Sequence, residues 1–147
     1  MKFLLFLVLG LYAIGAHSQQ KHGKMTNKQT VEKFLNGFND PSKIQESLNL
    51  LAEDYQFTNP MVKLNSKTEF IALAQEIGAV LTGVSIINIA SSGDWVATYY
   101  KFTSSIKEVD TNMASEWFRV ENGLIQESHL IYDASKWRKV YEQLEKK

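Results

Sequence analysis

The sequence contains no cysteine among its 147 residues. This absence excludes disulfide bonds, a thiolate zinc site, a cysteine nucleophile and the lipid-bearing cysteine of a lipoprotein. No Asn-x-Ser/Thr tripeptide occurs either, so N-glycosylation is not expected. Without disulfides, the fold has to be stabilised by its hydrophobic core. An aromatic content of 12% makes such a core plausible.

The sequence has no excess of either charge sign. Lysine and arginine number 16, aspartate and glutamate also number 16, and the formal net charge is +0. Nucleic acids and anionic membranes both require clustered positive charge, so we expect neither as a partner. The uncharged run Phe3–Ile14 is shorter than the roughly 20 residues that span a bilayer. We therefore expect no membrane span in the mature chain.

Motifs for metal and hydrolase chemistry are also missing. No His-x-x-x-His pair or comparable cluster of His, Asp and Glu has the spacing of metal ligands. No Gly-x-Ser-x-Gly motif marks a serine hydrolase. We therefore expect neither a metal nor a cofactor.

The first 18 residues have the features of a secretory signal peptide. Lys2 precedes the uncharged run. The tripeptide AHS (16–18) follows it and has the small-x-small pattern of a signal-peptide cleavage site. Removing these residues leaves 147 − 18 = 129, enough for one domain but not two. We expect an exported protein, either secreted or periplasmic. The expected organisation is a signal peptide at 1–18, a flexible leader at 19–25 and one domain at 26–147.

Apolar residues at helical spacing predict helices at residues 26–39, 40–51, 66–83 and 133–144. The first opens at Thr26, which forms a capping box with Gln29. In the second, we expect Asp40 as the N-cap and Pro41 as the first helical residue. The third predicted helix opens with a similar capping box, formed by Ser66 and Glu69.

Alternating and apolar runs predict strands at residues 55–59, 61–64, 84–90, 95–103, 112–120 and 124–132. The turn Glu121-Asn122-Gly123 predicts a hairpin between the last two, because Asn-Gly readily takes a positive φ. The expected cross-strand pairs are Val120–Leu124, Phe118–Gln126 and Glu116–Ser128, all on one face. A slip of one residue would exchange the two faces.

Helices and strands are segregated along the chain. Two helices, a strand and a third helix precede a run of antiparallel strands, and a helix closes the sequence. This order indicates the α+β class, with helices covering one face of a bent sheet. Such a sheet with a helical lid forms a cone that encloses a pocket.

Three segments carry a resemblance to a known family. They are FNDP (38–41), LLAEDYQFTNP (50–60) and SEWFRVENGLIQESHLIYD (115–133). In order and spacing they resemble the nuclear transport factor 2-like superfamily, within it the SnoaL-like, polyketide cyclase-like branch, over nearly all of residues 28–133. The resemblance implies a cystatin-like cone, with a curved antiparallel sheet and helices over its concave face. The closing helix looks like a common extension.

The superfamily includes ketosteroid isomerases, polyketide cyclases, scytalone dehydratase, limonene epoxide hydrolase and non-catalytic binding proteins, so the resemblance transfers no reaction. Ketosteroid isomerase uses an Asp base with a Tyr and a protonated Asp as oxyanion donors. By alignment, the base falls on Asn59, the Tyr on Phe34 and the second Asp on Glu116. Asn59 cannot take a proton from carbon and Phe34 has no hydroxyl to donate. Steroid isomerisation is therefore rejected.

Glu116 is the candidate catalytic residue. Inside an apolar cone its pKa would rise through desolvation, which suits general acid or base chemistry. The alternative places it at the pocket mouth, solvated or paired with Lys101 or Arg119. Both alternatives stay open on the sequence alone.

The pocket face defined by the hairpin pairing and the resemblance gives a set of candidate ligand-binding residues. They are Phe34, Tyr55, Phe57, Asn59, Phe118, Gln126 and Ser128. Asn59 and Tyr55 share a strand face and could bond a ligand carbonyl or hydroxyl. Equally, Asn59 could serve a turn before Pro60, and Tyr55 could be a core residue with a wet hydroxyl.

The opposite face of the sheet is expected to carry Trp117, His129 and Ile131. His129 beside Glu127 is interpreted as a surface or dimer-contact residue rather than a catalyst, since its ordinary pKa alone indicates nothing. This outer face commonly pairs in the superfamily. It therefore predicts a homodimer contact.

Three functions compete on these observations. The first is an exported module that binds a small, mostly apolar ligand in the cone. The second is a cofactor-free lyase or isomerase with Glu116 as acid/base and Asn59 or Tyr55 orienting the substrate. The third is a homodimeric protein-interaction module. The lost isomerase positions favour ligand binding over catalysis.

Overall fold

A computed structural model describes residues 24–144 of the chain. The predicted signal peptide at 1–18, and the predicted leader up to residue 23, lie outside the described residues. Within the described range no helix is long and apolar enough to cross a membrane. The elements are α1 (Asn27–Gly37), α2 (Ile44–Leu48), β1 (Leu51–Thr58), β2 (Lys63–Leu64), α3 (Lys67–Gly78), β3 (Leu81–Ser92), β4 (Trp95–Ser104), the 3-10 helix η1 (Lys107–Val109), β5 (Thr111–Glu121), β6 (Leu124–Tyr132) and α4 (Ser135–Leu144).

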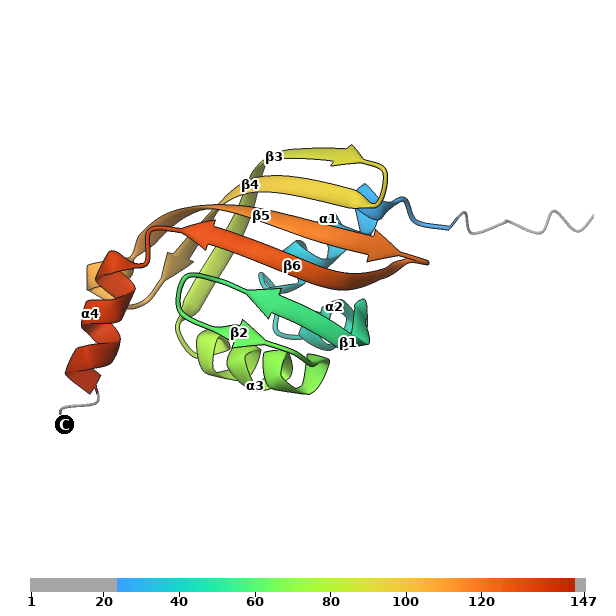
Figure 1. The fold of residues 1–147 in the computed structure, drawn as a ribbon. Helices are drawn as coiled ribbons and strands as arrows, with labels where there is room; N and C mark the ends of the chain where they lie inside the picture. Colours follow the sequence, from blue (N-terminus) through green and yellow to red (C-terminus); the bar gives the residue numbers. More distant parts are fainter. Residues whose placement is uncertain (1–23, 145–147) are drawn as a thin grey trace, which may run out of the picture.

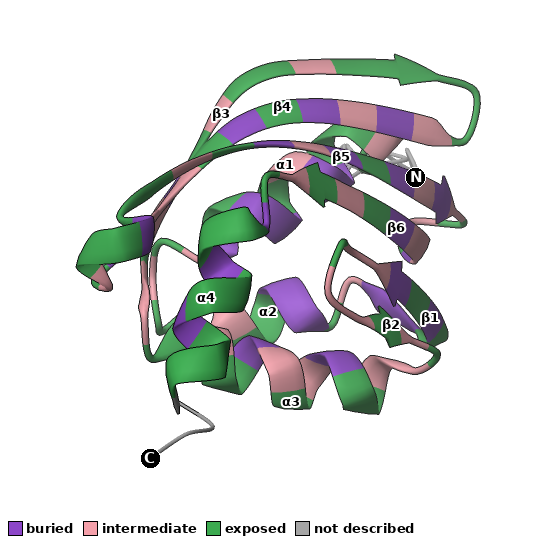
Figure 2. Cartoon of the chain, turned by 60° about the vertical axis from the view of Figure 1, so that its left-hand side comes forward, coloured by how far each residue is buried: buried purple, intermediate pink, exposed green. Residues whose placement is uncertain are grey.

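The strands form one six-stranded sheet in the order β2-β1-β6-β5-β4-β3. The sheet curves, with α1, α2 and α3 on its concave side and α4 beyond one end (Figure 1). This arrangement confirms the α+β cone. Along β4 and β5, buried positions alternate with more exposed ones, so one face of the sheet meets the helices and the other meets solvent (Figure 2).

The expected curved antiparallel sheet contains one parallel pair of strands. β1 runs parallel to β6, with Phe57 beside Ser128, while the other neighbouring strands are antiparallel. Hairpin signals predict direction only for strands joined by tight turns. Along the chain, β1 and β6 are separated by α3 and four further strands, so no turn signal fixes their relative direction.

Three predicted helix boundaries also differ from the structure, namely the start and end of α2 and the end of α3. Asp40 does not cap α2. Its carboxylate accepts hydrogen bonds from the backbone N–H and the hydroxyl of Ser42, and these bonds form a turn. The helix begins only at Ile44. Leu51 begins β1 and Leu81 begins β3, because each pairs with the sheet instead of extending the helix before it. The spacing of apolar residues could not show that sheet pairing would outweigh helix formation at these residues.

The β5–β6 hairpin has the expected turn but a different register. Asn122 and Gly123 have φ values of 53° and 81°, as the Asn-Gly turn predicts. The predicted pairs were wrong, since the structure has Val120–Ile125, Phe118–Ser128 and Glu116–Leu130. A bulge between Arg119 and Val120 accounts for the offset and takes Gln126 out of the pairing. Beyond the bulge, each residue of β5 pairs two positions further along β6 than predicted. A shift by an even number keeps the faces, so Glu116, Phe118 and Ser128 remain on one face.

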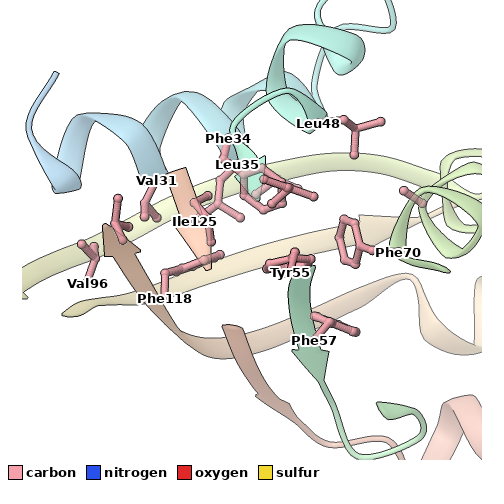
Figure 3. Packing of buried hydrophobic residues seen from close by; sticks show 14 of the residues in the cluster. Val31, Phe34, Leu35, Leu48, Tyr55, Phe57, Phe70, Val96, Phe118 and Ile125 are labelled. Atoms are coloured by element: carbon pink, nitrogen blue, oxygen red, sulfur yellow. The ribbon is translucent and has the colours of Figure 1, made fainter. Parts of the chain in front are cut away.

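The core lies between α1, α3 and the concave face of the sheet. Phe34 of α1 contacts Phe118 of β5 at a ring-centroid distance of 5.8 Å, and Phe70 of α3 contacts Tyr55 at 5.2 Å (Figure 3). Both pairs are edge-to-face, the favourable geometry for aromatic rings. The amphipathic stripe of α1 therefore supplies the packing that positions the cavity described next.

Candidate ligand cavity

A cavity of about 390 Å³ lies between the concave sheet face and the helices. This volume is within the usual range of small-molecule sites. Most of its lining is apolar, and several elements contribute aromatic rings. The aromatic residues are Phe34, Phe38, Phe57, Phe70, Tyr100, Phe102, Tyr132, Trp137 and Tyr141.

Helix α4 closes one end of this cavity. Trp137 and Val140 form a second small core with Val109 of η1, packed against Phe102 and Tyr132. The Trp137 indole N–H donates to Asn112 Oδ1 at 2.9 Å, which fixes the ring over the cavity end. A further anchor joins the Arg138 guanidinium to the Pro60 carbonyl at 2.8 Å.

Glu116 lies at the inner end of a buried chain of hydroxyl groups. The residue is only 4% exposed, yet it borders the cavity. Tyr100 Oη donates to its Oε2 at 2.7 Å, and Ser128 Oγ donates to its Oε1 at 2.7 Å. Ser128 in turn bonds the hydroxyl of Tyr55, also at 2.7 Å. Both carboxyl oxygens are therefore held by hydroxyl donors.

Burial sets the electrostatics of this network. Desolvation raises the pKa of Glu116 from 4.5 to about 7, although the hydrogen bonds from Ser128 and Tyr100 act in the opposite direction. Burial also raises the pKa of Tyr55 and of Tyr100 well above that of a free phenol, so both hydroxyls keep their protons. At neutral pH the site thus holds a carboxyl group poised between its two forms.

The alternative position for Glu116, solvated or paired with a basic residue, is not the one observed. Arg119 instead pairs with Glu121 and Glu127. Lys101 has an exposed side chain, one strand position beyond Tyr100 and so on the other face. Sheet parity separates both cations from the carboxyl group.

The structure divides the predicted pocket residues into two groups. Phe34, Phe57 and Asn59 border the cavity together with Glu116. Tyr55, Phe118 and Ser128 are fully buried in the layer behind it, where Tyr55 and Ser128 reach the cavity only through Glu116.

The two predicted amide residues bond the backbone near them. Asn59 Oδ1 accepts from the N–H groups of Met61 and Val62 at 2.7 and 2.8 Å, which closes the turn after β1. The Gln126 side chain donates to the carbonyls of Glu121 and Leu124 in the hairpin, and this residue does not border the cavity. Bulging of the strand at Gln126 is the cause.

The hydrogen bond from Tyr100 to Glu116 was not predicted from the sequence, which indicated only that the aromatic residues of this strand line the pocket and the back of the sheet. Tyr100 pairs with Ala114, so Glu116 is its diagonal neighbour on the same face of the sheet. Diagonal neighbours are about 7–8 Å apart, within reach of two long side chains. A β4–β5 register would have revealed the contact, but η1 lies in this connection and no turn motif sets the pairing.

The described residues contain no group of three or more His, Asp or Glu side chains that could hold a metal ion. His129 lies on the outer face, where its ring stacks on Trp95 at 6.0 Å and its Nε2 is 3.5 Å from Glu127. It is therefore remote from the chemistry of the cavity.

Comparison with known proteins agrees with this architecture. The family model described as SnoaL-like domain matches residues 31–128. None of the curated proteins matches the sequence. Among solved structures, a nuclear transport factor 2-like protein of unknown function from Cytophaga hutchinsonii superposes with a TM-score of 0.67 at 18% identity, covering 82% of this chain and 98% of that chain.

Two further solved structures show how widely the fold is used. An LEH-like epoxide hydrolase from M. tuberculosis has a TM-score of 0.65 at 20% identity, covering 77% of this chain and 86% of its own. A de novo designed protein with a curved β-sheet has a TM-score of 0.67 at 15% identity, covering 81% and 96%. At these identities the likeness concerns the fold alone.

Proposed function

The chain belongs to the SnoaL-like domain family, and on that premise we propose that its cavity binds a small, mostly apolar ligand. The observation that carries the proposal is a partly open pocket of about 390 Å³ whose lining is largely aromatic and aliphatic. A well-packed core leaves few voids larger than a water molecule. An apolar space of this size, bordered at one end by α4, is therefore better explained by an occupant than by imperfect packing.

The test is to identify what the protein carries. Native mass spectrometry of residues 19–147, purified from the natural host, is expected to show a bound small molecule that denaturation releases. Extraction and identification then give its chemical class. A protein that is consistently empty, and that takes up no hydrophobic probe, would contradict the proposal.

We also propose that the protein is exported, since residues 1–18 have the pattern of a signal peptide. Amino-terminal sequencing of the protein from its host is expected to begin at Gln19. Recovery of the intact chain starting at Met1 would count against export.

Glu116 favours a second candidate function, that of a cofactor-free lyase or isomerase. General acid–base catalysis is most effective when the catalytic pKa lies near the working pH, and this carboxyl group has a pKa of about 7. The test follows the retained compound for turnover in the wild type and in Glu116→Gln. Equal rates in the two proteins, or no turnover in either, would leave binding as the function.

The outer face of the sheet supports a homodimer as an additional property. Trp117 and Ile131 are 47% and 61% exposed there, next to the exposed side chains of Tyr99 and Met113. Large apolar side chains gathered on one face are typical of interaction surfaces. Sedimentation at increasing concentration is expected to show a dimer, and a strictly monomeric protein would contradict this proposal.

A further inference from the structure

Both charged residues that line the cavity are acidic. Glu116 borders its inner end, and Glu76 of α3 borders it with an exposed side chain. No lysine, arginine or histidine is among the described residues that line it. An apolar ligand with a negative group would therefore meet repulsion and no partner.

The Glu116 carboxylate is supplied with hydrogen bonds but not with a counter-charge. Tyr100 and Ser128 donate to its two oxygens, an arrangement suited to the ionised form. Buried charges in proteins are normally paired. The described part of the chain provides no cation within ion-pair distance of this carboxylate, so the ionised form can gain a counter-charge only from a cation in the cavity.

The remaining lining also suits a cation. Rings from α1, β1, α3, β4, β6 and α4 border the same space. The negative face of an aromatic ring attracts ammonium groups, most strongly where water is excluded. A site that combines one buried carboxylate with many rings can bind the charged end and the apolar body of one molecule.

We propose that the ligand is an apolar amine whose ammonium group pairs with the Glu116 carboxylate while its hydrocarbon part fills the aromatic cavity. This inference rests on the ligand-binding function proposed above and specifies the chemical class of the ligand. Glu116 is the recognition residue. Tyr100 and Ser128 are positioning residues that hold its carboxylate toward the cavity.

The pH dependence of binding follows from the groups that face this site. Those groups are Tyr55 from β1, Glu76 from α3, Tyr100 from β4, Ser128 and Tyr132 from β6, and Tyr141 from α4. The pKa of Tyr132 is about 12, and the pKa values of Tyr55 and Tyr100 are higher than those of free phenols, so these three stay neutral. Glu116 has a pKa of about 7 and gains its charge in the neutral range.

The experiment compares octylamine, octanol and octanoate by isothermal titration calorimetry between pH 5 and pH 8. The three probes share one hydrocarbon chain, and the amine stays protonated throughout this range. Amine affinity is expected to rise about tenfold per pH unit below pH 7 and to level off above it. At pH 8 the amine should bind more tightly than octanol, and octanoate more weakly than both.

Two variants assign the effect to one carboxylate. Glu116→Gln should remove the pH slope and the preference for the amine while octanol still binds. Glu76→Gln removes the same charge from the exposed cavity border and should keep the slope. If Glu116→Gln does not fold, the pH profile of the wild type still decides the question.

The outcomes separate the two proposals. Octanol binding as tightly as octylamine, or amine affinity that is flat or falls with rising pH, overturns the amine assignment but leaves ligand binding in the cavity intact. Failure of all three probes to bind at any pH overturns both. The rising profile with loss of slope only in Glu116→Gln supports both.

Discussion

Among single residues, Glu116 couples the stability of the fold to pH. Its pKa is raised from 4.5 in the unfolded chain to about 7 in the folded protein, so the folded state binds the proton more tightly. The stability linked to this residue is therefore fully present below pH 4.5 and is lost as the pH rises through 7. Integrated over that interval, the loss is about 3 kcal/mol as an order of magnitude.

We predict that the stability difference between wild type and Glu116→Gln depends on pH with this sign. The free energy of unfolding of the wild type, relative to the variant, should fall between pH 4.5 and pH 7.5. Urea unfolding of both proteins at intervals of one pH unit measures it. Asp40 and Asp133, whose pKa values are lowered by hydrogen bonds near them, are present in both proteins and cancel. A constant difference would contradict the prediction.

Tyr100 and Tyr55 should affect Glu116 unequally. Tyr100 donates directly to the carboxylate, whereas Tyr55 acts only through Ser128. Tyr100→Phe removes a hydrogen bond that favours the charged form, so the pKa of Glu116 should rise further. Tyr55→Phe is the matched control and should raise it less. Carbon-13 NMR titration of the Glu116 carboxyl group distinguishes the two, and equal shifts would contradict the direct role of Tyr100.

From the sequence, the residues that share a face of the sheet could be predicted, because side chains alternate between the two faces along each strand. Glu116 and Ser128 were expected on one face, and they share it, because a two-residue shift preserves parity. Their direct cross-strand pairing was not predicted correctly, since no local signal marked the bulge at Gln126. Tyr100 could not be assigned because its partner lies on another strand across an irregular connection.

At the scale of elements, α4 is the part of the structure whose contribution is most easily tested. Trp137 of α4 is buried, packs against Val109 of η1 and borders the cavity. Trp137→Ala should destabilise the protein by about 3 kcal/mol, the lower end of the usual cost of such truncations. The measurement is the thermal unfolding midpoint. Lys139→Ala, on the exposed side of the same helix, should leave it unchanged.

The same variant shows whether α4 unfolds together with the domain. A single transition at a lower temperature is expected for Trp137→Ala, because the cluster around Trp137 adjoins the main core through Phe102 and Tyr132. An unchanged midpoint would mean that α4 is only loosely attached. The cavity would then lack its closure at that end.

Elements were predictable wherever a local motif defines them. Thr26 forms its capping box with Gln29, and β6 has the bounds expected from the sequence. The errors at α2 and α3 arose where the sheet takes over residues with helical spacing, as at Leu51 and Leu81. Tertiary pairing decided those boundaries, and a single sequence contains no measure of it.

For the whole molecule, the outer sheet face should determine the oligomeric state. Trp117→Lys places a charge in the middle of the exposed apolar row and should weaken a dimer by at least tenfold in its dissociation constant. Leu124→Lys introduces the same charge at the hairpin turn and serves as the control. Analytical ultracentrifugation over a concentration series gives both constants. Equal constants for the two variants would place any dimer contact elsewhere.

The cone was predictable at this scale because order and spacing of the elements specify it, and the SnoaL-like resemblance agrees with them. The cavity was not predictable in size or closure. Its volume depends on how Trp137 and Tyr141 of α4 lie against β6, and this helix falls outside the residues that the family model matches. The sequence predicted Glu116 as the candidate acid or base, but only the structure shows that this carboxyl group is buried beside the cavity.

The parallel pairing of β1 with β6 has a consequence for the order of folding. Phe57 meets Ser128 across 71 residues of chain, whereas β3 to β6 are joined in sequence. Contacts between distant segments require a large loss of chain entropy and form late. We expect pulsed hydrogen exchange to show β4 and β5 protected before β1, and simultaneous protection would contradict this order. The last event then joins Tyr55 to Ser128, so the chain has no complete binding site until its sixth strand has emerged and returned to the first.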